Sequence, residues 1–118
     1  MKFDELVGKS LARVTGAEVG SEEVRFEMED GTVFRLYHDQ DCCESVDVAE
    51  VHGDPASMSG EIRMAVESSN SDDQPTEFAE SWKWTFYRVI TAKGTLVLRW
   101  LGRSNGYYSE SVTFDRAD

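Results

Sequence analysis

The stretch SWKWTFYRVITAKGTLVLRWLG, residues 81–102, decides the fold of this chain. Side chains of different character alternate along it with a period of two, which is typical of β-strands. Trp84 falls on one face of the first strand and Tyr87 on the other, so apolar residues occupy both faces. Such a pattern indicates strands that are covered on both sides. With a turn at residues 93–94, the stretch predicts a central β-hairpin.

The same period recurs on both sides of this hairpin. VRFEMEDGTVFRLYH predicts a second hairpin at about 23–38, closed by Asp30-Gly31 as a two-residue turn. A last strand is predicted in GYYSESVTFD, with Tyr108, Val112 and Phe114 on one face. The remaining strands are predicted at residues 10–17, 45–51 and 61–68.

These strands predict a single mostly-β domain over residues 1–118. Seven or eight strands joined by short turns form a strongly bent antiparallel sheet, a sandwich or a small open barrel. The polar segment at about 68–79 predicts a mobile loop. Residues 1–7 predict one helical turn or an irregular lead-in.

Charge is the clearest feature of the composition. The net charge is −11, and residues 1–60 carry 14 acidic and 5 basic side chains, a balance of −9. A chain of this kind lacks the basic footprint that phosphate binding needs, so no direct nucleic-acid binding is expected. It is expected to be attracted to basic protein surfaces. The alternative interpretation is that the acidity only keeps a small protein in solution.

The cellular setting is predicted from what the sequence lacks. No apolar run approaches the roughly 18 residues of a membrane span, and the first ten residues have no apolar core of a secretion signal. Cys42 and Cys43 are neighbours, which does not suit ordinary disulfide geometry. We therefore expect reduced cysteines, no membrane association and a cytoplasmic location.

The segment YHDQDCCESV, residues 37–46, concentrates groups capable of chemistry. A zinc site is disfavoured because adjacent cysteines rarely direct both sulfurs at one ion. A calcium or magnesium site lacks the glycine and later ligands of a calcium loop. The acidic surroundings disfavour a reactive thiolate. The favoured interpretation is structural, with one cysteine in the core and the aspartates capping a turn. The candidate binding residues here are His38, Asp39, Asp41, Cys42, Cys43 and Glu44.

A second polar cluster surrounds the turn signal at residues 104–106. Its donors, acceptors and aromatic faces suit either a binding surface or an ordinary hairpin. Strand alternation places Glu110 on an apolar face, where it needs a partner such as Arg99, His38 or Arg88. A pocket shared by a carboxylate, a histidine and the cysteines is the best candidate site. The candidates added here are Arg99, Tyr107, Tyr108 and Glu110.

Three segments together resemble a small family of uncharacterised bacteriophage and bacterial proteins, domain-of-unknown-function family 7448. They are HDQDCCESV, WTFYRVITAKGTLVLRWLG and SNGYYSESV. The likeness extends from the GKS near the start of the chain to Phe114. It implies a small intracellular domain, and it implies no catalytic residues.

No phosphate loop, nucleophile elbow or zinc-protease helix is present in the sequence. We therefore expect a protein that is not an enzyme, needs no cofactor and acts by protein–protein interaction. One form of this hypothesis is inhibition of a host nucleic-acid-binding or defence protein with a basic surface. The alternative is a small-molecule or metal-binding module centred on the HDQDCCE stretch. Exposed strand edges also allow a homodimer.

Overall fold

A computed structural model describes residues 1–117 of the chain. It is mostly β, as predicted, with eight strands in one antiparallel sheet that is not closed into a barrel. The strand order across the sheet is β4-β7-β6-β5-β1-β2-β3-β8. The elements are η1 (Phe3–Leu6), β1 (Ser10–Thr15), β2 (Glu23–Met28), β3 (Val33–Tyr37), β4 (Ser45–His52), η2 (Pro55–Ser57), β5 (Gly60–Asn70), β6 (Ser81–Thr91), β7 (Gly94–Ser104) and β8 (Thr113–Arg116).

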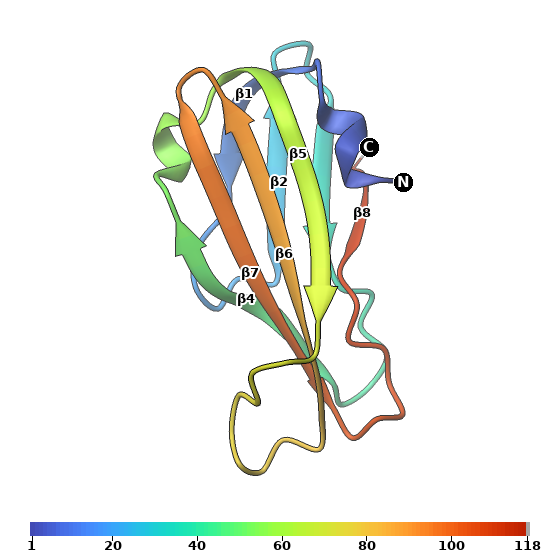
Figure 1. The fold of residues 1–118 in the computed structure, drawn as a ribbon. Coiled ribbons are helices and arrows are strands. Elements are labelled where there is room, and N and C mark those ends of the chain that lie inside the picture. The colour runs from blue at the N-terminus through green and yellow to red at the C-terminus, as the bar shows by residue number, and fades with distance from the viewer. Residues whose placement is uncertain (118) are drawn as a thin grey trace.

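The sheet bends at the junction of β1 and β5, where only two residue pairs join the strands. Figure 1 shows the result, with β4, β7, β6 and β5 in one layer and β1, β2 and β3 behind it. The apolar inner faces of the two layers form the core, because their burial removes apolar surface from water. Its largest fully buried side chains include Phe26, Leu36, Tyr87, Leu98 and Trp100, each less than 2% exposed.

The predicted central hairpin is confirmed as β6 and β7, which pair along their whole length. Its turn lies one residue earlier than predicted, at 92–93, because Thr91 pairs with Gly94. The Thr91 hydroxyl also accepts a hydrogen bond from the Lys93 amide at 3.1 Å. Tyr87 lies on the inner face, whereas Trp84 is buried on the outer face beneath the segment that joins β5 to β6.

The second hairpin is confirmed as β2 and β3, but its turn differs from the prediction. The Met28 amide donates to the Thr32 carbonyl, which leaves three residues in the loop. The favoured two-residue turn requires a positive φ at both Asp30 and Gly31. Gly31 has a φ of 91°, and no residue other than glycine among residues 1–117 has a positive φ. Asp30 thus lacks the positive φ that the two-residue turn needs, and the loop is one residue longer than predicted.

The last predicted strand is shorter than expected. Only Thr113–Arg116 forms β8, and residues 105–112 are irregular. This segment passes directly over Gly102 of β7, where a β-carbon on residue 102 would lie 2.3 Å from the Glu110 carbonyl oxygen. Phe114 is buried, whereas Tyr108 and Val112 are only partly covered. The alternation predicted for this segment is wrong before Thr113.

The connection between β1 and β2 covers one edge of the sheet. The Gly20 amide donates to the Val48 carbonyl at 2.8 Å, and the Val48 amide donates to the Ser21 carbonyl at 2.9 Å. Val48 lies on β4, which is an edge strand. These two bonds occupy the outward-facing backbone groups of Val48, in the middle of that edge.

The buried hydroxyl of Tyr87 leads to a stability prediction. Among residues 1–117 no hydrogen-bond partner lies within 3.5 Å of it, although the Glu67 carboxylate is near, and burial followed by the influence of Glu67 raises its pKa above the usual range. Removing an unsatisfied buried polar group costs little, so we expect Tyr87→Phe to be neutral or to stabilise the fold by up to about 1 kcal/mol. Urea unfolding measures this. Tyr37→Phe is the matched control, because the Tyr37 hydroxyl donates to Asp115 at 2.8 Å and its loss should destabilise. A less stable Tyr87→Phe protein would contradict the prediction.

Candidate functional site

Three connecting segments meet at one end of the sheet, which we call the loop end. It comprises residues 38–44 between β3 and β4, residues 71–80 between β5 and β6, and residues 105–112 between β7 and β8. Figure 1 shows all three at the lower end of the molecule. One hollow of about 340 Å³ is lined from all three sides, by Cys43, Phe78 and Asn105 among others.

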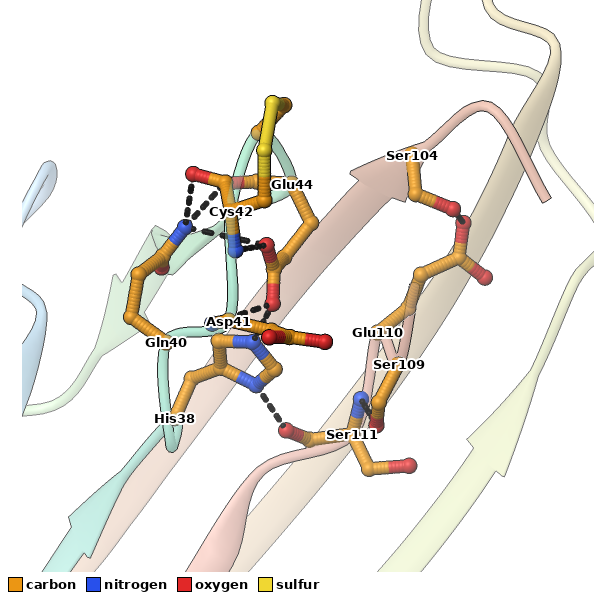
Figure 2. A network of polar contacts seen from close by, with 10 residues as sticks. His38, Gln40, Asp41, Cys42, Glu44, Ser104, Ser109, Glu110 and Ser111 are labelled. Carbon is orange, nitrogen blue, oxygen red and sulfur yellow. Dashed lines mark hydrogen bonds and ion pairs between the residues drawn. A yellow bond between two sulfur atoms is a disulfide. The ribbon is translucent and has the colours of Figure 1, made fainter. Parts of the chain in front are cut away.

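Glu44 organises the first of these segments. Its side chain is fully buried, and each carboxylate oxygen accepts two hydrogen bonds. Oε1 accepts from the Cys42 amide at 2.8 Å and from Gln40 Nε2 at 3.1 Å. Oε2 accepts from His38 Nε2 at 2.7 Å and from the Asp41 amide at 3.0 Å. Figure 2 shows these donors around the carboxylate. The hydrogen bond from His38, followed by those from the backbone, lowers the pKa of Glu44 to about 2.

His38 bridges two hydrogen-bond acceptors. Its Nδ1 lies 2.7 Å from the Ser111 carbonyl oxygen, and its Nε2 lies 2.7 Å from Glu44. Both contacts are within hydrogen-bond distance of oxygen atoms, so each ring nitrogen is occupied by one neighbour. His38 and Glu44 are thus a buried hydrogen-bonded pair, which is an ion pair when the imidazole is protonated. The pair ties the turn at 38–44 to the segment that precedes β8.

The cysteines differ from their prediction. Cys42 and Cys43 are joined in a disulfide between neighbours, whereas reduced thiols were expected. Both cysteines are exposed, so neither enters the core. The cysteine side chains lie outward because the backbone amides of Asp41 and Cys42 point inward and donate to Glu44. Figure 2 shows the sulfur atoms pointing away from His38, and the hollow lined by His38 is a different one from the hollow lined by Cys43.

The predicted role of the aspartates is also wrong, because the buried Glu44 supplies the capping carboxylate. The side chains of Asp39 and Asp41 are exposed. The sequence signal for Glu44 was its position three residues after Asp41, which allows a side chain to reach back to a turn amide. Among the residues that the structure describes, no group of three or more histidine, cysteine or acidic side chains is arranged to hold a metal ion.

Arg99 lies outside this network, on the outer face of β7. Its guanidinium stacks 3.6 Å from the centre of the Trp84 ring. Nη1 pairs with Glu50 at 2.7 Å, and Nη2 pairs with Asp73 at 3.3 Å. The predicted pairing of Arg99 with Glu110 is therefore wrong. Glu110 instead accepts a hydrogen bond from the Ser104 hydroxyl at 2.8 Å, which Figure 2 shows apart from His38.

The segment at 71–80 is held against this outer face. Trp82 Nε1 donates to the Asp72 carbonyl at 2.9 Å, and Trp84 Nε1 donates to the Asp73 carbonyl at 2.7 Å. The loop is shorter than predicted at its first end, because β5 continues to Asn70. Trp84, which suggested a covered strand, and its neighbour Trp82 therefore use their ring nitrogens to position an acidic loop.

Exposed aromatic rings and free carboxylates dominate the surface of the loop end. Phe78 and Tyr107 are each 83% exposed, and Tyr107 contacts the ring of Tyr108 at 5.1 Å between centroids. Phe78 was not among the predicted site residues, although an isolated aromatic residue in a polar loop is a signal for it. The acidic side chains of the loop end that form no ion pair with any residue of 1–117 are Asp39, Asp41, Asp72, Glu77, Glu80 and Glu110, the last of which accepts a hydrogen bond from Ser104.

The open eight-stranded sheet and its acidic loop end define a small all-β domain. The chain belongs to the family called domain of unknown function 7448, whose sequence model matches residues 4–114. This confirms the resemblance seen in the sequence. Comparison with curated proteins and with solved structures found no match. In the described part of the chain, no helix has the length and apolar character needed to cross a membrane.

Proposed function

We propose that this protein binds a protein partner with a basic surface and that it has no catalytic activity. The observation that carries the proposal is the pair of exposed rings, Phe78 and Tyr107, among unpaired carboxylates at the loop end. Aromatic residues that remain exposed on a small domain are typical centres of binding interfaces. The surrounding negative charge would attract and orient a basic partner.

The proposed setting is the cytoplasm of a bacterial or phage-infected cell, a choice that the disulfide between Cys42 and Cys43 does not support. A nucleic-acid-binding or defence protein offers a suitable basic groove, and occupying that groove would inhibit it. The net charge of −11 supports this choice of partner, since the same charge opposes direct binding to nucleic acid. A homodimer would have to overcome repulsion between two such chains.

The alternative function, a small-molecule or metal-binding module centred on HDQDCCE, is less well supported. Both oxygens of Glu44 and both ring nitrogens of His38 are already engaged in hydrogen bonds. A metal ion would have to displace donors from a buried carboxylate. The exposed Asp39 and Asp41 alone offer too few ligands for the cations that prefer oxygen.

We expect the aromatic rings to contribute most of the affinity. In a binding assay against a panel of purified basic nucleases and DNA-binding proteins, Phe78→Ala with Tyr107→Ala should weaken binding about 30-fold or more. Val19→Ala is a matched control, because Val19 is 70% exposed but lies between β1 and β2. Raising salt from about 50 mM to about 500 mM should weaken binding further, because surface charges are then screened. An affinity that changes neither with the two substitutions nor with the salt concentration would contradict the proposal.

A further inference from the structure

A second hollow lies on the inner face of the sheet, apart from the exposed rings of the loop end. It has a volume of about 260 Å³ and lies between β5, β6 and the segment before β8. Its size corresponds to about nine water-sized volumes, which accommodates a small metabolite. The polar residues that line it include Glu67, Ser69, Lys83, Thr85 and Ser111.

The hollow contains one positive and one negative side chain that do not meet. The Lys83 ammonium donates to the Ser111 hydroxyl at 3.3 Å and forms no ion pair within residues 1–117. Glu67 likewise has no cationic partner in that range. Glu67 pairs with Tyr87 across the two strands, so Lys83 lies four residues further along β6. Strand geometry then separates the two Cα atoms by about 14 Å, which leaves a gap between the charged ends.

The surroundings of the two charges are rich in hydrogen-bonding groups. Ser69 and Thr85 form a cross-strand pair between them, and Thr85 is buried. At the other end the Tyr87 hydroxyl lies near the Glu67 carboxylate.

We propose that this hollow binds a small zwitterion of the α-amino acid class. Its carboxylate lies on Lys83 and the Ser111 hydroxyl, and its ammonium group lies on Glu67. A ligand with both charges pairs with two side chains that form no ion pair with each other. A charge-assisted hydrogen bond at each end fixes its orientation. This site does not depend on the partner proposed for the loop end, because none of its residues is an exposed ring or a free carboxylate of that surface.

The test is a titration of the isotopically labelled full-length protein with each common α-amino acid, followed by two-dimensional NMR. At least one amino acid should give saturable shifts at the amides of Thr85 and Ser111. Acetate and methylamine, which carry one charge each, should bind at least ten times more weakly. Lys83→Met and Glu67→Gln should each weaken amino acid binding at least tenfold. The other resonances in each spectrum should keep the dispersion of a folded protein.

Two matched controls lie on the same strands or their turn. Lys93→Met removes a lysine from the β6–β7 turn, and Glu61→Gln removes an exposed carboxylate from β5. Both should bind the amino acid as the natural sequence does. The proposal is overturned if no amino acid gives saturable shifts, or if acetate binds equally well and Glu67→Gln has no effect. Binding to the basic partner is measured separately, so the two proposals fail independently.

Discussion

Gly102→Ala is expected to lower the free energy of unfolding by about 2–3 kcal/mol and to release residues 105–112 from β7. The added β-carbon would lie 2.3 Å from the Glu110 carbonyl oxygen and 2.7 Å from the Glu110 β-carbon. Both are far inside van der Waals contact, and the first is a backbone atom that cannot rotate away. The hydrogen bond between Ser104 and Glu110 should be lost with the displaced segment.

Gly8→Ala is the control for this substitution. Gly8 has a φ of 91° but no atom within 4 Å of an added β-carbon, so alanine there carries only the backbone cost of about 1–2 kcal/mol. Urea unfolding gives both stabilities, and amide hydrogen exchange reports whether residues 105–112 open. Only Gly102→Ala should increase exchange in that segment. Equal exchange in the two variants would show that the close contact with Glu110 is not required.

Glu44→Gln is expected to destabilise the protein at neutral pH and to remove part of its sensitivity to acid. The folded pKa of Glu44 is about 2, below its ordinary value of 4.5. A lowered pKa means that the carboxylate stabilises the folded state fully above pH 4.5, and this contribution is lost as the pH falls toward 2. The glutamine side chain keeps one oxygen that can accept a hydrogen bond. Its NH₂ group is a donor and would face other donors, among them the backbone amides that donate to Glu44.

The difference between the two proteins should therefore depend on pH in a defined direction. The melting temperature of Glu44→Gln should lie below that of the natural sequence by roughly 5–10 °C at pH 7, and the gap should narrow between pH 5 and pH 2. Asp39→Asn is the control, because Asp39 is exposed in the same turn. A gap that stays constant over this range would contradict the assignment of Glu44 as an ionised, hydrogen-bonded group.

The strands could be predicted from the sequence because side-chain alternation reports directly which face is buried. The central hairpin and the hairpin at 23–38 follow from this rule. The rule failed at residues 106–112, where Tyr108 and Val112 alternate as they would in a strand. There the chain crosses the surface of β7 that Gly102 leaves free of a side chain. The close contact between Gly102 and Glu110 replaces the strand pairing that the alternation predicts.

The candidate site was predicted in composition but not in arrangement. His38 and Glu44 were both selected, yet their pairing depends on where the chain turns at 39–43. Arg99 was matched with Glu110, although the strand register places it opposite Glu50. Register across β4 and β7 includes an irregularity between Val48 and Glu50, which no local pattern in the sequence reveals.

The short connection that covers Val48 has a consequence for the behaviour of the protein at high concentration. An open sheet has two edges, and an uncovered edge is a template for intermolecular strand addition and amyloid-like aggregation. Gly20 and Ser21 already occupy the backbone groups at the middle of β4. The opposite edge strand, β8, has only four residues. Continuous growth of the sheet from molecule to molecule is thus obstructed on one side and limited to a very short template on the other.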